Sequence, residues 1–410
     1  MKDSFFTCPP HLYHILYFIL YLYQLFTGVY PACMMITGSK RSSRLPGSEI
    51  RSLLRHAGSR DIISLAGGHP RDELLPLQHL QEAVGRALTR FGRRSLQYGR
   101  TEGEAELRDW VCGYYQDRGI RVTPEQVLIT SGSQQGLDLL ARGLFDPGDP
   151  VYMNDPGYIG AIQAFQAAEL VCQPWNFTST PGSAPGNLYI VPNFANPTGE
   201  SLPREVRRAL LQSSHWIIAD DPYGQISFCG PTSPWLPDIP IEDGPLILLG
   251  SGSKWLCPGL RIGWIVAPTA LIELLGRLKQ AADLQTSTLS QFTFLELAGL
   301  LPPEGARDLL VPVYRQQRDA MVTALKRYWD DDGAFRTPQG GFFLWLTLPE
   351  GWSAGDFAAR ALERGVAVVP GTAFALDRSR PGHPGTIRLS YSKETPEMID
   401  RAIARLAEIL

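Results

Sequence analysis

Short apolar runs alternate with amphipathic stretches through the middle of the chain. The runs have the length and composition of buried strands, and they fall at residues 127–130, 151–154, 170–173, 188–192, 216–220, 246–250 and 262–267. The stretches between them predict helices at residues 131–144, 155–168 and 203–213. This alternation predicts a mainly parallel sheet between helices, in which ligands bind at the carboxyl ends of the strands.

The pattern changes toward both ends of the chain. Before the sheet we expect helices at residues 46–57, 77–91 and 104–118, and a strand at 61–66. Leu107, Val111 and Tyr114 should face the interior from the third of these helices. After the sheet, the expected elements are helices at residues 311–328 and 354–365, strands at 342–348, 366–369 and 386–390, and a closing helix from Pro396.

These elements predict an α/β chain with two domains. A large domain should span residues 76–310, and a smaller α+β domain should span residues 311–410. Residues 41–75 should form an N-terminal segment that joins the small domain.

Residues 1–40 form an apolar extension that does not match the rest of the chain. Residues 12–35 carry no charge apart from a protonated form of His14, and such a segment is long enough to span a bilayer. Lys40, Arg41 and Arg44 follow it, so a real anchor would leave the remaining chain on the cytoplasmic side. Alternatively, translation starts at Met34 or Met35, because five tyrosines dilute the apolar segment. We expect a cytoplasmic protein that meets a membrane only if residues 12–35 are a true anchor.

Composition excludes several classes of function. With 410 residues, 44% hydrophobic and 19% charged, the chain fits a globular protein of two domains. A net charge of -3 gives no electrostatic basis for binding nucleic acid. The six cysteines form no CxxC pair and the seven histidines no HExxH spacing, so we expect neither a disulfide framework nor a metal site.

Residues 246–267 contain the most informative pair of charges. Lys254 and Arg261 are the only charged residues in this apolar, glycine-rich stretch. A desolvated lysine has a lowered pKa, and its neutral amine forms a Schiff base with a carbonyl, whereas a fixed arginine suits a phosphate. Pyridoxal 5'-phosphate (PLP) carries both a carbonyl and a phosphate, so this pair of residues suggests PLP as the ligand. Taken alone, the pattern fits a lysine on a surface turn equally well.

Further candidates follow the predicted strands. Residues 131–134 (SGSQ) open a helix and offer a phosphate cradle, although they also fit an ordinary N-cap. Tyr158 could stack on a flat ring or belong to the core, and Asn196 could bind a phenolic oxygen or cap a turn. Asp220, with Tyr223 three residues later, could keep a pyridine nitrogen protonated or cap a helix.

In this order, the segments resemble a known signature. SGSQQG (131–136), DPGYIGA (155–161), PNFANPTG (192–199), ADDPYG (219–224) and SGSKWLCPGLRIGW (251–264) look like the motifs of fold-type I PLP enzymes. The match is to class I/II aminotransferases, and most closely to their 2-aminoadipate/kynurenine-type branch. SLAGGHP (64–70), LQYGRTEG (96–103), GGFFLWL (340–346) and TIRLSYS (386–392) extend it to roughly residues 43–410. The resemblance implies an aspartate aminotransferase-like fold and PLP as the cofactor.

The resemblance also implies individual roles. Lys254 would bind the cofactor as a Schiff base (the internal aldimine) and move the proton between substrate and cofactor. Asp220 would pair with the pyridinium nitrogen, and the D-x-x-Y spacing of the family selects it over Asp221. Tyr223 and Asn196 would hold the phenolic oxygen. The implied catalytic residues are therefore Lys254, Asp220 and Tyr223.

Cofactor and substrate contacts are implied in the same way. Tyr158 would stack on the ring, and the phosphate would be bound by Ser133, Gln134, Ser251, Ser253 and Arg261, joined by Tyr98 from the other subunit of a homodimer. Arg388 would clamp the substrate carboxylate, with Gly67, Gly68 and Asn196 nearby.

The function implied is an aminotransferase (EC 2.6.1.-) that moves an amino group between an L-amino acid and a 2-oxo acid, with 2-oxoglutarate as an expected partner. The same site could instead serve a C–S lyase, a decarboxylase or a racemase. A PLP-binding regulatory domain is a further alternative, which the apolar rather than basic character of residues 1–40 disfavours.

The substrate stays open. Gly252, Trp255, Arg100 and Ala195 depart from residues common at these places in the family. Arg44, Arg51 and Arg55 could meet an acidic substrate side chain or form a solvated face, so aromatic, branched-chain and acidic amino acids all remain candidates.

Overall fold

The computed structural model describes residues 38–39, 41–42, 62–177, 185–212, 215–232, 235–329, 333–377 and 382–410. The chain divides into two compact units, Met1–Arg44 and Leu45–Leu410, and the fold below is that of the second. The apolar run at 12–35, the helix expected at 46–57 and the three arginines Arg44, Arg51 and Arg55 lie outside the described residues. Within the described part, no helix combines the length and apolar character needed to cross a bilayer.

A seven-stranded sheet forms the centre of this unit, in the order β2-β8-β7-β6-β5-β3-β4. The strands are β2 (Val127–Thr130), β3 (Pro150–Met153), β4 (Val171–Pro174), β5 (Leu188–Ile190), β6 (Ile217–Asp220), β7 (Leu246–Ser251) and β8 (Gly263–Val266). The pairs from β4 through β7 are parallel, whereas β8 runs antiparallel to both β2 and β7. The predicted mainly parallel sheet is confirmed, and every strand lies within a residue or two of its expected position.

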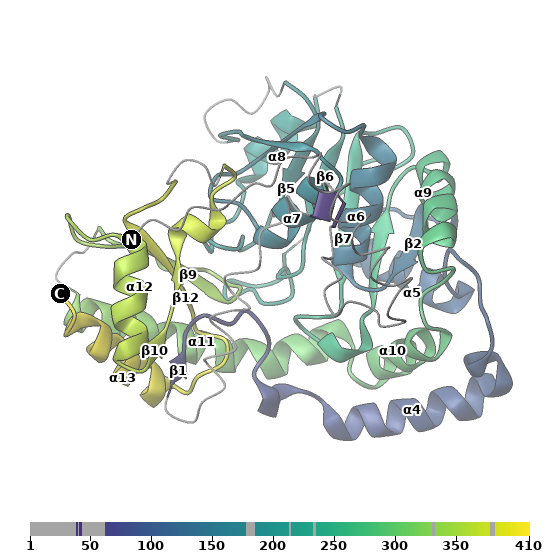
Figure 1. Cartoon of the computed structure of the whole chain (residues 1–410). Helices are drawn as coiled ribbons and strands as arrows, with labels where there is room; N and C mark the ends of the chain where they lie inside the picture. Colours follow the sequence, from purple (N-terminus) through teal and green to yellow (C-terminus); the bar gives the residue numbers. More distant parts are fainter. Residues whose placement is uncertain are drawn as a thin grey trace, which may run out of the picture. The chain divides into compact units, whose positions relative to one another are not determined.

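Helices cover both faces of the sheet (Figure 1). Successive strand residues point to opposite faces, so Ile217 and Ala219 join one apolar core and Ile218 joins the other. The core around Ile218 includes residues of α6 (Ser133–Leu144), α7 (Ile159–Ala167) and α9 (Thr269–Ala282). The opposite core includes residues of α5 (Ala105–Gln116), α8 (Arg204–Leu210) and α10 (Thr288–Leu300).

A smaller antiparallel sheet is built from the C-terminal residues. Its order is β11 (Val369–Pro370), β12 (Thr386–Ser390) and β9 (Phe343–Thr347). The surrounding helices are α11 (Pro303–Tyr328), α12 (Ala354–Glu363) and α13 (Pro396–Ala407), and Figure 1 shows them beside β9 and β12. The early strand β1 (Ile63–Ser64) pairs in parallel with β10 (Val366–Ala367). Residues 63–64 therefore join the C-terminal part of the chain; the exact domain boundaries stay a prediction.

Some elements differ from the sequence prediction. Helix α4 (Leu77–Phe91) has the predicted bounds, but α9 and α10 were not predicted and α11 starts at Pro303 rather than at residue 311. Helix α10 packs along α4, and its buried residues lie on more than one side, so it lacks a clear amphipathic pattern. On α5, Tyr115 rather than Tyr114 is fully buried with Leu107 and Val111. Residues 61–66 contribute only the two-residue strand β1.

Candidate active site

A pocket lies at the carboxyl ends of the parallel strands. Ten residues line it, and eight of them are predicted site residues: Ser133, Tyr158, Asn196, Asp220, Tyr223, Ser251, Ser253 and Lys254. Val191 and Pro222 complete the lining. The predicted residues are the last residues of β6 and β7 or lie in segments that follow β2, β3, β5, β6 and β7, so strand topology brings them together.

Lys254 follows β7 and points toward the N-terminal glycine pair. Its Nζ donates a hydrogen bond of 2.8 Å to the backbone carbonyl of Gly68. Burial lowers the pKa of Lys254 to about 8, and the cations Arg388 and Arg261 act in the same direction, while Asp220 opposes them. A much larger fraction of Lys254 than of an ordinary lysine is therefore the neutral, nucleophilic amine near neutral pH.

Asp220 is the last residue of β6, and 2% of its surface is exposed. Its Oδ2 accepts a hydrogen bond of 2.9 Å from the phenol of Tyr189, whereas its Oδ1 is buried and has no partner. Burial raises the pKa of Asp220 to about 7, although the Tyr189 hydrogen bond lowers it. Asp220 is therefore the carboxylate with a free acceptor at the pocket. Asp221 is committed elsewhere, because its Oδ1 accepts from the side-chain amide of Asn193 at 3.0 Å.

Two tyrosines supply the aromatic surface of the pocket. Tyr158 precedes α7 as its N-cap residue, and burial raises the pKa of its phenol to about 12. Tyr223 is buried against Phe342 and Phe343, with ring centroids 5.6 and 5.8 Å away, and burial raises its pKa as well. Both phenols therefore keep their protons near neutral pH and can donate hydrogen bonds.

Hydroxyl groups and a helix N-terminus converge at one end of the pocket. Ser133 begins α6, and the preceding Gly132 has a positive φ of 82°. The Ser251 hydroxyl donates to Ser253 Oγ at 2.8 Å, and Arg261 Nη1 lies 3.5 Å from the same oxygen as a donor. A Cβ on Gly132 would lie 2.3 Å from Arg261 Nη2, so only glycine leaves room for the guanidinium here. These donors and the helix N-terminus suit an anion.

Arg388 lies on β12 and is fully enclosed, with 2% exposed. Its Nη1 donates to Asn196 Oδ1 at 2.9 Å, and its Nη2 donates to the carbonyl of Ala66, the residue before Gly67 and Gly68. The guanidinium carbon lies 4.3 Å from the centre of the Phe343 ring, and Nε has no partner. Burial lowers the pKa of Arg388 to about 10, which still leaves a cation at neutral pH. Asn196 lines the pocket, so Arg388 is one side chain away from it.

A family model described as "Aminotransferase class I and II" matches residues 60–406. The chain belongs to the class I and II aminotransferases.

Individual aminotransferases align over nearly the whole chain. It is 38% identical over 396 residues to the 2-aminoadipate transaminase of Thermus thermophilus, covering 90% of this chain and 96% of that relative. It is 34% identical over 401 residues to aromatic-amino-acid aminotransferase 1 of Thermococcus litoralis, covering 91% and 93%. These likenesses confirm the predicted aminotransferase class.

A solved structure confirms the predicted fold type. The α-aminoadipate aminotransferase of Thermus thermophilus, complexed with N-(5'-phosphopyridoxyl)-L-leucine, has a TM-score of 0.78 and 36% identity. The alignment covers 90% of this chain and 96% of that chain.

Tyr98 and Gln134 are predicted cofactor-binding residues of this aminotransferase that do not line the pocket. Tyr98 is 78% exposed and is not among the residues that line the pocket. Gln134 does not line the pocket either, and its side-chain amide donates to the carbonyl of Gly160 at 2.8 Å. An exposed position is compatible with a contact to the other subunit. The predicted role of Tyr98 at the phosphate site of that subunit stays a prediction.

Sequence analysis missed two residues that support the site. Tyr189 is the middle residue of β5 and holds Asp220. Arg207 on α8 is buried, and its Nη2 donates to the carbonyl of Pro192 at 2.7 Å and to Asn193 Oδ1 at 2.9 Å, at the start of the loop that carries Asn196. A polar residue within an apolar strand was a signal for Tyr189, whereas Arg207 resembles the other charged residues of its helix.

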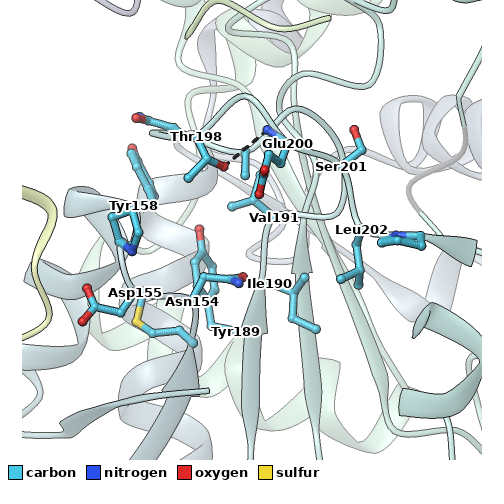
Figure 2. Close-up of a pocket in the computed structure, with 16 residues that line it drawn as sticks. Asn154, Asp155, Tyr158, Tyr189, Ile190, Val191, Thr198, Glu200, Ser201 and Leu202 are labelled. Carbon is cyan, nitrogen blue, oxygen red and sulfur yellow. Dashed lines mark hydrogen bonds between the residues drawn. The ribbon is translucent and has the colours of Figure 1, made fainter. Parts of the chain in front are cut away.

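Figure 2 shows a second cavity, which adjoins the first because the two share lining residues. Tyr158, Val191 and Asn196 line both cavities. Figure 2 shows Tyr189 near Asn154 and Ile190 in the lining of this second space. The aromatic ring of Tyr189 thus borders the second cavity, while its hydroxyl binds a residue of the first.

Proposed function

We propose that this aminotransferase uses pyridoxal 5'-phosphate to move an amino group between an L-amino acid and a 2-oxo acid, with 2-oxoglutarate as an acceptor. One observation carries the proposal: a lysine with a pKa near 8 and an aspartate with an unpartnered buried oxygen line the same pocket. Pyridoxal phosphate has a partner for each of these groups: a carbonyl for the lysine amine, a protonated ring nitrogen for the aspartate, and a phosphate for the hydroxyl groups.

The residues present fit this cofactor. Asp220 Oδ1 is a buried acceptor without a donor, and a protonated pyridine nitrogen supplies one. The hydroxyls of Ser251 and Ser253, Arg261 and the N-terminus of α6 suit a phosphate dianion. Tyr158 offers a flat face for the ring, and Tyr223 with Asn196 offers polar groups for its phenolic oxygen.

When bound, the cofactor supplies a conjugated ring that withdraws electrons from the α-carbon of the amino acid. Asp220 stabilises a positive charge on the ring nitrogen and thereby strengthens this withdrawal. The pKa of Lys254, lowered to about 8, leaves part of Nζ neutral near neutral pH, so Nζ can accept the proton from the α-carbon and later return it as general base and general acid.

Arg388 orients the substrate. Its guanidinium is buried, already fixed by Asn196 and Ala66, and positively charged, so it can bind a carboxylate in a bidentate manner. Because the α-carboxylate is common to amino acids and 2-oxo acids, one arginine serves both half-reactions. Gly67 and Gly68 bring backbone close to Lys254 on the same side.

Two further features belong to the proposal. The enzyme acts as a homodimer in which Tyr98 of each subunit completes the phosphate site of the other; its exposed position supports this. The catalytic part works in the cytoplasm.

Purified protein tests the function directly. Amino donors are screened against 2-oxoglutarate while glutamate formation and the absorption of the bound cofactor are followed. We expect glutamate to form with at least one donor, and Lys254→Ala to abolish its formation while the protein stays folded. Substantial turnover by K254A would overturn the assignment of Lys254. Release of ammonia without glutamate would favour elimination over transamination.

A further inference from the structure

Tyr189 lies behind the proposed cofactor site, and the mechanism above does not use it. It belongs to β5, where it pairs with Ile218 of the parallel neighbour β6. Residues 218 and 220 lie on the same face of β6, so Asp220 is on the face that carries Tyr189. The phenol ring is 2% exposed and packs edge-on against Phe165 of α7, with ring centroids 5.5 Å apart. Sheet register and helix packing therefore direct the hydroxyl to one target.

That target is the carboxylate of Asp220. The hydroxyl donates a hydrogen bond of 2.9 Å to Oδ2, and the other oxygen, Oδ1, has no partner. With Oδ2 fixed, the plane of the carboxylate is fixed as well. The oxygen left free belongs to a residue of the pocket lining. One contact thus decides which oxygen stays available to a ligand.

The charges around Asp220 make this contact important. The groups that influence it are Tyr189, Tyr158, Tyr223, Asp221 and Lys254. Burial and the neighbouring Asp221 raise the pKa of the Asp220 carboxyl, whereas Tyr189 and Lys254 lower it. Lys254 is itself partly neutral, so the Tyr189 hydroxyl is the more constant of the two stabilising groups. Burial raises the pKa of Tyr189 far above its usual value, and the phenol therefore stays a donor.

We infer that Tyr189 is a positioning residue for the reaction, which keeps Asp220 ionised and oriented so that its free oxygen meets the protonated ring nitrogen of the cofactor. This inference rests on the proposed function. Tyr189 touches neither substrate nor reacting atoms, and it acts through Asp220.

Tyr189→Phe isolates the hydroxyl, because the ring that packs against Phe165 is retained. A hydrogen bond to a charged group is worth enough to move the pKa of Asp220 upward by about 1 to 2 units when it is lost. The ionised carboxylate strengthens cofactor binding through the protonated ring nitrogen, so the pH below which the holoenzyme releases its cofactor should rise in Y189F. The absorption of the bound cofactor should titrate at a correspondingly shifted pH.

The experiment compares holoenzymes across the pH range by equilibrium dialysis and absorption spectroscopy. Tyr391→Phe is the matched control, because this buried hydroxyl donates to an uncharged carbonyl, that of Gly340, at 2.8 Å. Both variants should lose some thermal stability, but only Y189F should shift the pH midpoint. In a D220N background, Y189F should cause no further shift, since the ionisable partner is gone.

Each outcome has a distinct meaning. An unshifted midpoint in Y189F, with wild-type protein that binds pyridoxal phosphate, overturns the inference and leaves the proposed function intact. An equal shift in Y391F also overturns it, because general loosening would then explain the effect. Wild-type protein that binds no pyridoxal phosphate refutes the proposed function itself.

Discussion

The protonation of Lys254 can be measured directly in cofactor-free protein. The cause of its lowered pKa is burial first, followed by the positive charges of Arg388 and Arg261, with Asp220 acting against them. We expect covalent capture of an aldehyde to depend on the fraction of neutral amine. The rate should therefore rise with pH and level off above a midpoint near 8.

The magnitude follows from the pKa values. An ordinary lysine with a pKa of 10.5 is about 0.1% neutral at pH 7.5, whereas one with a pKa of about 8 is about 25% neutral. Capture at this pH should thus be about two hundred times faster than at an exposed lysine of equal intrinsic reactivity. Removal of one cation, in Arg388→Gln, should move the midpoint upward, because it takes away the second cause of the lowered pKa.

The assay mixes cofactor-free protein with pyridoxal at a series of pH values, traps the product with borohydride and quantifies the modified peptide around Lys254 by mass spectrometry. Modification of exposed lysines in the same digest is the internal control. A midpoint near 10.5 at Lys254 would refute the argument that burial neutralises it.

Three substitutions test other parts of the site. Arg388→Lys keeps the charge but loses bidentate geometry, so kcat/KM for amino acids should fall at least about tenfold with an unchanged cofactor spectrum; equal kinetics would contradict the clamp. Gly132→Ala places a Cβ 2.3 Å from Arg261 Nη2 at a φ of 82°, so dialysis should remove the cofactor faster than from wild type, and an equal rate would argue against the cradle. Trp255→Ala removes a side chain that is 3% exposed, and urea unfolding should show that the free energy of unfolding falls by about 3–5 kcal/mol. A fall below about 1 kcal/mol would mean that neighbouring side chains fill the space left by the indole ring.

The sequence was most informative where chemistry and topology coincide. In a mainly parallel sheet the carboxyl ends of the strands lie at one edge, so polar residues at or just after these ends meet there. Of the eight predicted pocket residues, five were predicted from such positions, Lys254 from its charge in an apolar run, and Ser251 and Ser253 from the family resemblance. The choice of Asp220 over Asp221 came from motif spacing. The structure adds a physical reason for it, because among the described residues Asp220 Oδ1 is buried without a partner, whereas Asp221 Oδ1 accepts from Asn193.

Other features depend on contacts between distant residues, which local pattern does not encode. Helix α10 is buried on more than one side, so its sequence lacks the one-sided apolar pattern by which helices are predicted. At Gly252 the Phe294 ring of α10 occupies the space beside the backbone, where a Cβ would lie 2.3 Å from a ring carbon, so a larger residue would need this ring to move. Tyr189 is an ordinary strand residue until the register with β6 brings it to Asp220.

Tyr98 allows the proposed homodimer to be tested through cofactor binding. It is 78% exposed and does not line the pocket, yet family resemblance assigns it to the phosphate site of the other subunit. Tyr98→Phe should remove one hydrogen bond to a charged phosphate, worth about 1.5–3 kcal/mol, and so weaken cofactor binding by about 10- to 150-fold. Dialysis of the purified variant against buffers of decreasing cofactor concentration measures this loss.

Mixed dimers then show whether the Tyr98 that completes a cofactor site belongs to the same subunit as Lys254 or to the partner. In a dimer of one K254A and one Y98F subunit, the subunit that retains Lys254 has a partner that retains Tyr98. If Tyr98 acts across the interface, this one site is intact and the mixed dimer should show about half the activity of wild type at limiting cofactor. If Tyr98 acts within its own subunit, the single site with Lys254 lacks the tyrosine, and activity should be about half that of the Y98F homodimer, which has two such sites. Differently tagged subunits allow the mixed dimer to be isolated, and monomers alone after such purification would contradict the homodimer from which the argument starts.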